Sequence, residues 1–379
     1  MPLVLNDEQR MVKDSAEGFF AGEGPVAQLR KLRDAGDADG FDRSLWAKMA
    51  EMGFAGVAIP EQFGGAGLGM VAAGLIQEAI GRNLTLSPFL SSAIVAATAI
   101  VKGGTDEQKA ALLPGMAAAD MIVALAADEL PRHAPQHVAT RAEPSGNGFR
   151  LTGSKPFVLD GHVADRLIVA ARTSGADDDM AGITLFLVDP RTAGVAVSRR
   201  SVVDSRNAAA VTLDNCQVDG ADVLGAVGEG FATLEAALDA GRACLAAEML
   251  GVSAQSFETT VDYLKQREQF GQKIGSFQAL QHRAAHLFCE VELARSVTLK
   301  ALTALDAGDP RAPFFASLAK AKAGDVAKLA TNEAVQMHGG IGMTDEYDIG
   351  FFMKRARAAG ETFGDGAFHA DRVARLLNY

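Results

Sequence analysis

Residues 263–278 of this chain read Tyr263-Leu-Lys-Gln-Arg267-Glu-Gln-Phe270-Gly271-Gln-Lys-Ile274-Gly275-Ser-Phe277-Gln278, a segment that contains the boundary between two predicted helices. Apolar residues at helical spacing lead into it, so the sequence predicts a helix that ends near Phe270 and Gly271. A second helix is expected to begin near Ser276. An arginine near one helix end and glutamines beside the next helix start favour an anionic, amide-bearing ligand, because guanidinium groups and exposed N–H groups both donate hydrogen bonds.

The chain on both sides of this segment is predicted to be helical. Upstream, Leu245, Met249 and Val252 lie at i, i+4 and i+7 and so share one face of a helix. Downstream, helical spacing continues almost to the end of the chain, with a break at Gly308-Asp-Pro310. The beginning of the chain, up to about residue 115, also carries helical patterns.

Short β-rich runs fill the stretch between about residue 120 and residue 226. Runs such as 166–171 and 182–189 are rich in branched apolar residues, and Gly, Pro, Asp and Asn bound them. No long helical pattern separates the runs, which favours an antiparallel sheet or small barrel over a parallel α/β sheet. The acidic run Asp177–Asp179 is predicted to be a solvated hairpin loop between two of them.

The length and the change of pattern along the chain predict its domain organisation. A chain of 379 residues is expected to form two or three domains, since a domain holds roughly 100–200 residues. We predict an α+β fold with an N-terminal helical domain over 1–118, a middle β domain over 119–226 and a C-terminal helical bundle over 227–379.

Composition argues against several classes of protein. The 36 basic and 47 acidic residues give a net charge of −11, which argues against a nucleic-acid binder. No apolar run reaches about 18 residues, so no membrane span is expected. The chain turns polar after its first five residues, unlike a signal peptide, and its three cysteines lie far apart, which predicts free thiols. We therefore expect a cytoplasmic protein.

Metal sites and phosphate loops are not predicted either. His282 and His286 lie four residues apart on a predicted helix, but no third ligand is evident near them. The chain has no Gly-Lys-Ser/Thr phosphate loop and no Gly-x-Ser-x-Gly nucleophile elbow. We therefore expect no metal centre.

A second segment, residues 336–347, reads Gln336-Met-His338-Gly339-Gly340-Ile-Gly342-Met-Thr344-Asp-Glu346-Tyr347. Its paired glycines allow a ligand or another backbone to approach closely. In spacing and order the two segments closely resemble the acyl-CoA dehydrogenase family, and the resemblance covers essentially the whole chain. Further marks of the family are Pro60-Glu-Gln-Phe-Gly-Gly65, Gly153-Ser-Lys-Pro-Phe157 and Gly228-Glu-Gly-Phe231. The resemblance implies a helical domain, a β-barrel-like middle domain and a four-helix C-terminal bundle.

The resemblance also implies FAD as the cofactor. In this family the flavin ring lies between the middle sheet and the last bundle, and a neighbouring subunit contacts the adenosine-diphosphate half. The residues implied to bind FAD are Arg267, Phe270, Phe277, Gln278, Gln336, Met337, His338, Gly339 and Gly340. Arg267 is implied to contact the pyrophosphate, and a surface ion pair with Glu268 or Asp262 is the alternative. His338 is expected either to pack beside the cofactor or to contact it.

The family's reaction is the α,β-dehydrogenation of an acyl-CoA thioester. A carboxylate removes the α-proton, the β-hydride moves to the flavin, and hydrogen bonds to the thioester oxygen stabilise the enolate-like charge. Arg242 matches an arginine that lines the substrate side of the site. The resemblance implies an electron-transfer flavoprotein or a similar acceptor as a partner, and a homo- or hetero-oligomer, either a dimer or a tetramer.

Both positions at which family members carry the catalytic glutamate lack a carboxylate in this chain. One position lies in the segment Arg357-Ala-Ala-Gly-Glu-Thr-Phe363-Gly364-Asp365 and holds Phe363. The other lies just before Arg242 and holds Gly241. Two threonines that the family places beside the flavin are replaced by Asp128 and Leu159. The sequence therefore indicates a divergent member of the family.

Three carboxylates are candidates for the missing base: Asp365, Glu361 and Glu248. Asp365 lies two residues after Phe363 and is favoured, although it also suits the N-cap of the last helix. Glu361 lies two residues before Phe363, and Glu248 lies about 10 Å along a helix from Gly241. A chain without any base stays an alternative. So do a non-catalytic or half-catalytic subunit that completes a partner's FAD site, and a flavin oxidase or monooxygenase on the same fold.

Overall fold

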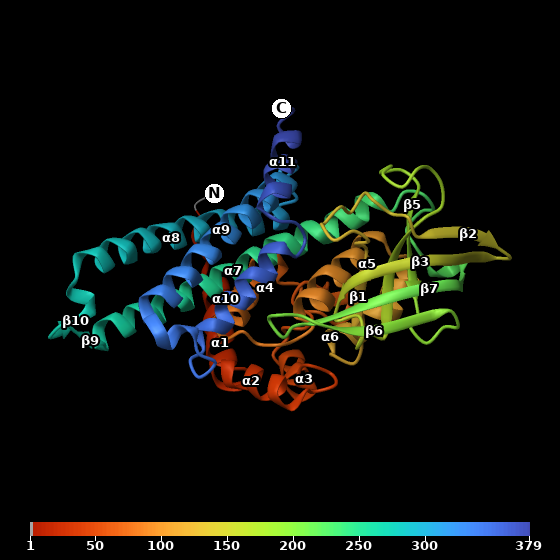
Figure 1. Cartoon of the computed structure of the whole chain (residues 1–379). Coiled ribbons are helices and arrows are strands. Elements are labelled where there is room, and N and C mark those ends of the chain that lie inside the picture. Colours follow the sequence, from red (N-terminus) through yellow and green to blue (C-terminus); the bar gives the residue numbers. More distant parts are fainter. Residues whose placement is uncertain (1–2) are drawn as a thin grey trace. The chain divides into compact units, whose positions relative to one another are not determined.

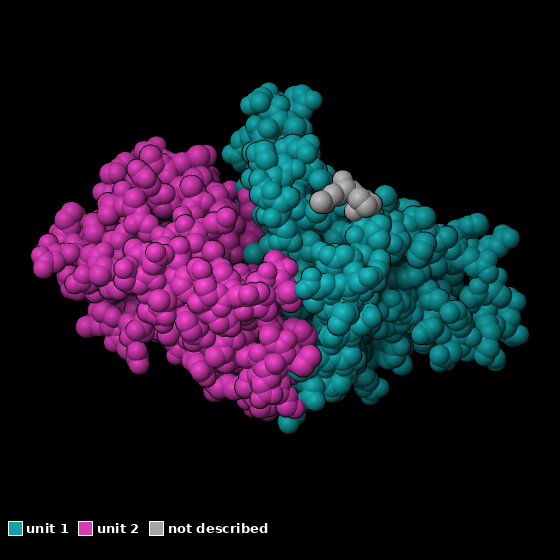
Figure 2. All heavy atoms as spheres, turned by 180° about the vertical axis from the view of Figure 1, so that it is seen from behind, with its two compact units in different colours: residues 1–31, 70–86, 242–379 teal, residues 32–69, 87–241 magenta. Residues whose placement is uncertain are grey.

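The computed structural model describes residues 3–379 and shows an α+β chain (Figure 1). The chain forms two compact units, coloured separately in Figure 2. Residues 1–31, 70–86 and 242–379 form the first, which we call the helical unit. Residues 32–69 and 87–241 form the second, which we call the sheet unit. Within residues 3–379, no helix combines the length and the apolar character that crossing a membrane requires.

Long helices make up the helical unit, and the last of them form a bundle. Its helices, of which α2, α4 and α7 extend beyond it, are α1 (Asp7–Glu23), α2 (Val26–Ala35), α4 (Gly69–Asn83), α7 (Phe231–Gln266), α8 (Gln278–Asp306), α9 (Ala312–His338), α10 (Ile349–Glu361) and α11 (Gly366–Leu376). Helix α9 packs against α8, α10 and α11. Leu250 of α7, Leu287 and Val291 of α8, and Val326 of α9 lie in one buried apolar cluster. The break predicted at Gly308-Asp-Pro310 is confirmed, because α8 and α9 are joined there.

Helices α4 and α7 approach each other closely at two glycines. A methyl group on Gly81 would lie 2.1 Å from the carbonyl oxygen of Glu248, and one on Gly251 would lie 2.0 Å from that of Glu78. Any larger residue at either position would collide with the backbone of the other helix. The two glycines therefore set the distance between α4 and α7. This distance in turn positions the segments that are joined to the two helices.

The sheet unit holds an eight-stranded sheet and the shorter helices. Its strands are β1 (Val123–Ala126), β2 (Arg141–Ser145), β3 (Gly148–Leu159), β4 (Arg166–Arg172), β5 (Ile183–Val188), β6 (Val195–Ser201), β7 (Asn207–Asp219) and β8 (Val223–Leu224). They follow the order β6-β7-β3-β2-β4-β5-β8, with β1 paired to β4. The helices are α3 (Arg43–Glu51), the π-helix η2 (Phe89–Ala96), α5 (Ala97–Gly103) and α6 (Asp106–Ala117), with short 3₁₀ turns at η1 (Glu61–Phe63) and η3 (Gly220–Asp222).

Most neighbouring strands are antiparallel, as the sequence predicts, but the expectation needs one correction. Strand β1 pairs with β4 in parallel, with Val123 opposite Arg166, and β2 touches β4 in parallel at Arg141. The parallel pairing is possible because no tight turn joins β1 to β4: β2 and β3 lie between them in the chain, so the connection is long enough to return to the same end of the sheet. The predicted loop at Asp177–Asp179 does connect β4 and β5.

The helix boundary predicted near Phe270 is wrong. Helix α7 ends at Gln266, and residues 268–273 form a small hairpin of β9 (Glu268–Gln269) and β10 (Gln272–Lys273). Phe270 and Gly271 lie at its turn with φ angles of 53° and 76°, in the left-handed region that a helix cannot use. The second helix begins at Gln278, after a 3₁₀ turn, η4 (Ile274–Ser276), that occupies the predicted start.

Candidate functional site

The turn between α10 and α11, residues 360–365, carries Phe363, which the resemblance aligns with the catalytic base of the family. Phe363 adopts φ of 58°, a left-handed conformation that is uncommon for any residue except glycine. Two buried cationic side chains, Arg242 and Lys320, hold the backbone of this turn. Arg242 Nε donates to the Phe363 carbonyl at 3.4 Å, and Lys320 Nζ donates to the Gly360 and Gly364 carbonyls at 3.0 and 2.9 Å. We call residues 360–365 the α10–α11 turn.

Arg242 reaches this turn from α7 and is buried. Its guanidinium carbon lies 5.5 Å from the centre of the Phe368 ring, on the first turn of α11. The stacked ring and the bonded carbonyl together fix the guanidinium in one orientation. Arg242 therefore supports the backbone of the α10–α11 turn.

Asp365 caps α11, as the sequence predicts. Its Oδ1 accepts from the Phe368 amide at 2.8 Å, and its backbone is extended, as expected for an N-cap. The side chain is half-buried, and its second carboxylate oxygen has no hydrogen-bond partner among residues 3–379. One oxygen is therefore anchored at the helix start, and the other is available for a proton.

The other two candidate carboxylates are placed differently. Glu361 lies on the exposed surface at the end of α10 and forms an ion pair with Arg357 at 3.2 Å. Glu248 is buried on α7, where it accepts from Gln77 Nε2 at 2.7 Å and pairs with Arg355 at 3.0 Å. Of the three carboxylates, only Asp365 combines a place within the α10–α11 turn with partial burial.

Arg267 lies exposed directly after α7. The expected alternative, an ion pair with a neighbouring acid, does not form: Glu268 pairs with Lys273 at 2.6 Å, and Asp262 pairs with Lys265 at 3.7 Å. Throughout the described chain, residues 3–379, no carboxylate pairs with the Arg267 side chain. Its guanidinium is therefore free to bind an anion from outside the chain.

Of the two aromatic residues that follow Arg267, Phe270 is exposed and Phe277 is half-buried. Phe270, with 90% of its surface exposed, packs edge-on against Phe277, with 6.2 Å between ring centres. Gln278 follows as the first residue of α8 and lies exposed. The exposed Phe270 ring and the half-buried Phe277 ring together form an apolar surface that another molecule can cover.

The glycine-rich segment after α9 lies at the same end of the bundle, because His338 stacks on Tyr263 of α7 with 4.3 Å between ring centres. His338 is buried, contacts Tyr347 as well, and its Nδ1 donates to the Ala334 carbonyl at 2.7 Å. Burial lowers the pKa of His338 below its ordinary value. His338 therefore packs as a neutral aromatic residue within the chain.

The neighbours of His338 divide between core and surface. Met337 is buried, whereas Gln336, Gly339 and Gly340 are exposed. A methyl group on either glycine would meet no atom within 4 Å, and Gly339 has φ of 64°. This open backbone lies where a ligand can approach its N–H groups closely.

Asp128 and Leu159, which the resemblance aligns with two threonines of the family, both lie in the sheet unit. Asp128 pairs with His133 Nδ1 at 2.8 Å, just after β1, and Leu159 ends β3. Beside them Lys155 is fully buried and pairs with Glu129 at 2.6 Å. Burial lowers the pKa of Lys155, against the opposing charge of Glu129. The end of β1 is therefore occupied by paired charges rather than by hydroxyl groups.

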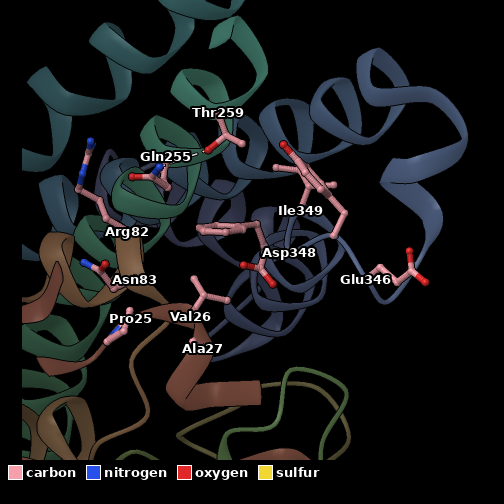
Figure 3. A pocket seen from close by; sticks show the side chains of 12 residues that line it. Pro25, Val26, Ala27, Arg82, Asn83, Gln255, Thr259, Glu346, Asp348 and Ile349 are labelled. Atoms are coloured by element: carbon pink, nitrogen blue, oxygen red, sulfur yellow. Dashed lines mark hydrogen bonds between the residues drawn. The ribbon is translucent and has the colours of Figure 1, made fainter. Parts of the chain in front are cut away.

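A pocket of about 480 Å³ opens elsewhere in the helical unit (Figure 3). Arg82 and Asn83 at the end of α4 line it together with Gln255 and Thr259 of α7, whose side chains are hydrogen-bonded at 3.2 Å. Gln255 lies about 20 Å along α7 from Arg242, so the pocket is separate from the α10–α11 turn. Among residues 3–379, no three His, Cys, Asp or Glu side chains gather closely enough to hold a metal ion.

Comparisons of sequence and of structure with known proteins point to the same family. Sequence models of the acyl-CoA dehydrogenase N-terminal, middle and C-terminal domains match residues 6–120, 132–216 and 228–377. Acyl-CoA dehydrogenase FadE12 of Mycobacterium tuberculosis is 31% identical over 94% of this chain and 92% of its own length. The structure of butyryl-CoA dehydrogenase from Megasphaera elsdenii has a TM-score of 0.91 at 26% identity, over 100% of both chains. The ChsE4-ChsE5 complex from Mycobacterium tuberculosis has a TM-score of 0.88 at 26% identity, over 100% of this chain and 99% of that one.

Proposed function

Because this chain belongs to the acyl-CoA dehydrogenase family, whose members are oxidoreductases that act on CH–CH bonds, we propose that it catalyses the FAD-dependent α,β-dehydrogenation of an acyl-CoA thioester. The observation that carries the proposal is the α10–α11 turn. Its backbone is held in place by Arg242 and Lys320, and it carries the half-buried carboxylate of Asp365.

The residues of the helical unit fit FAD. Arg267, which has no carboxylate partner among residues 3–379, suits the pyrophosphate, and the open backbone at Gly339 and Gly340 suits the same group. When bound, FAD would supply the hydride acceptor for the β-carbon. The sheet unit fits less well, because Asp128 and Leu159 replace hydroxyl groups there.

We assign two roles within the turn. Asp365 accepts the α-proton on the oxygen that does not cap α11, so that the cap keeps the carboxylate in one orientation. The backbone N–H of Phe363 donates to the thioester oxygen, where negative charge develops as the proton leaves. A backbone donor does not depend on the side chain, which is why phenylalanine at this position is compatible with the role. Reoxidation is assigned to an electron-transfer flavoprotein or a similar acceptor.

The test of this proposal is Asp365→Asn. A general base contributes about 10²–10⁴-fold, so turnover of an acyl-CoA with an artificial acceptor is expected to fall by that factor. Asparagine caps a helix nearly as well as aspartate, so the melting temperature and FAD binding are expected to stay unchanged. Asp371→Asn, on the exposed side of the same helix, is the matched control. A loss of less than about tenfold with unchanged melting would remove Asp365 as the base.

A second candidate is a non-catalytic or half-catalytic subunit of a heteromeric acyl-CoA dehydrogenase. The observation that favours it is that Phe363 and Gly241 occupy both base positions, while the side chain of the exposed FAD-side residue Arg267 has no carboxylate partner within residues 3–379. The similar ChsE4-ChsE5 structure is a complex of two named chains. Purification of the chain alone separates the candidates, with oligomer mass, FAD content and turnover as the measurements. A homo-oligomer with full FAD occupancy and turnover of its own would contradict the second candidate.

A further inference from the structure

Lys320 is a buried cation at the middle of α9, with 1% of its surface exposed. Its ammonium group donates to the Gly360 carbonyl at 3.0 Å and to the Gly364 carbonyl at 2.9 Å. Burial of an ammonium group is unfavourable unless it is hydrogen-bonded, so these two carbonyls are a large part of what keeps Lys320 in place. The same two bonds join both ends of the α10–α11 turn to α9.

A role as a simple helix cap does not account for both contacts. Gly360 lies in the last turn of α10, where carbonyls lack partners in the helix and carry partial negative charge, so a lysine there is expected to stabilise the helix. Gly364 lies beyond the end of α10, on the far side of Phe363. The second bond therefore constrains the turn itself.

The conformation of the turn needs such a constraint. Phe363 has φ of 58°, which is unfavourable for a residue with a Cβ atom, so its own preference would return it to a more common conformation. Lys320 holds the carbonyls on both sides of Phe363, and Arg242 holds the carbonyl of Phe363 itself. These contacts over-determine the backbone between residues 360 and 364.

We propose that Lys320 is a positioning residue that fixes the direction of the Phe363 backbone N–H, and through it the ability of this chain to recognise the carbonyl of an acyl thioester. The inference rests on the proposed function, because it concerns the same turn. It predicts that Lys320 contributes to carbonyl recognition without touching the ligand.

The experiment compares two probes by isothermal titration calorimetry on the full chain. The probes are octanoyl-CoA and its thioether S-octyl-CoA, in which a CH₂ group replaces the thioester carbonyl. One hydrogen bond to the carbonyl is expected to give the wild type about a three- to tenfold preference for the thioester. Lys320→Met removes the donor and keeps the apolar stem, so the preference is expected to disappear while the affinity for S-octyl-CoA stays unchanged. A merely structural lysine would affect both probes equally.

The matched control is Lys322→Met on the same helix. Lys322 is partly exposed and, within residues 3–379, its ammonium group pairs with Glu290 alone, so this variant is expected to keep the full preference for the thioester. If Lys320→Met also keeps it, the inference about Lys320 is overturned and the proposed function stands. If the wild type binds the two probes equally, the carbonyl contact that the proposed function assigns to the Phe363 N–H is overturned, and the inference with it.

A second variant covers the case in which Lys320→Met does not fold, as judged by circular dichroism. Lys320→Gln keeps an N–H donor on a shorter, neutral side chain. Its preference for the thioester over the thioether is expected to be weaker than that of the wild type but not lost. A full wild-type preference in Lys320→Gln would overturn the inference, because a side chain that cannot hold both carbonyls would then suffice.

Discussion

Asp160 is a buried carboxyl group at the end of β3, and it couples the stability of the sheet unit to pH. Burial raises its pKa from 3.8 to about 6, although Ser91 Oγ donates to it at 2.5 Å. The folded chain therefore holds a proton that the unfolded chain releases. This bound proton stabilises the folded chain relative to the unfolded chain. The stabilisation is fully present below about pH 4 and is lost as the pH rises through about 6.

We predict that Asp160→Asn removes this pH dependence. The difference between a pKa of 3.8 and one of about 6 corresponds to about 3 kcal/mol, so the variant is expected to be more stable than the wild type at pH 7.5 by up to that amount. At pH 4 the two proteins are expected to unfold alike, because the wild-type carboxyl is then protonated. Urea unfolding across this pH range measures the difference, and parallel pH profiles would contradict the prediction.

Residues whose partners are close in sequence could be predicted, and those with distant partners could not. The N-cap role of Asp365 depends on an amide three residues away, so the local pattern indicates it. Lys320 and Gly364 are 44 residues apart, and Glu248 and Arg355 are 107 apart. Their roles depend on how helices pack, which no spacing within one helix reveals. The sequence therefore names Glu248 as a candidate base, whereas the structure shows a buried ion pair.

The crossing of α4 and α7 offers a test of close helix packing. A methyl group on Gly251 would lie 2.0 Å from the Glu78 carbonyl, so Gly251→Ala is expected to force the helices apart. Overpacking of this kind costs about 1–3 kcal/mol, and the midpoint of urea unfolding is expected to fall accordingly.

Gly324→Ala is the matched control for this variant. Gly324 lies within α9 and a methyl group there would meet no atom within 4 Å, so alanine is expected to stabilise by about 0.5–1 kcal/mol through its higher helix propensity. Destabilisation by both substitutions, or by neither, would show that the close approach at Gly251 is not what limits the helix distance.

Periodicity predicts the helices better than it predicts where they end. Leu245, Met249 and Val252 are all buried on α7, as their spacing indicates. The hairpin after α7 was not expected, because its strands have only two residues each and are exposed, so they leave no alternating pattern. The parallel pairing of β1 with β4 was missed for a related reason: alternation marks a strand but not the direction of its neighbour.

The helical unit is assembled from three separate stretches of the chain. Helix α7 begins in the sheet unit and continues into the helical unit at Arg242, so one regular element belongs to both. Changes of composition along the chain cannot show this arrangement, because the helical pattern of α7 does not change where the units meet.

Arg267 lies exposed directly after α7, where it can contact a ligand held by a neighbouring subunit. If the flavin of one subunit is held by the Arg267 of its neighbour, Arg267→Ala is expected to weaken FAD binding by about 10- to 100-fold, the loss of one charge-assisted hydrogen bond. Unfolding of the apoprotein is expected to stay unchanged, because no residue within 3–379 pairs with this side chain. Lys265→Ala, which removes only the exposed ion pair with Asp262, is the control.

Dilution distinguishes a contact across subunits from one within a chain. In the wild type, FAD affinity measured by flavin fluorescence is expected to fall once dilution separates the subunits, since the neighbouring arginine is then lost. The Arg267→Ala protein lacks that contact at every concentration, so its affinity is expected to be low and to change less on dilution. Wild-type affinity in the variant would exclude Arg267 from the flavin site. An equal loss at all concentrations would place its contact within the same chain.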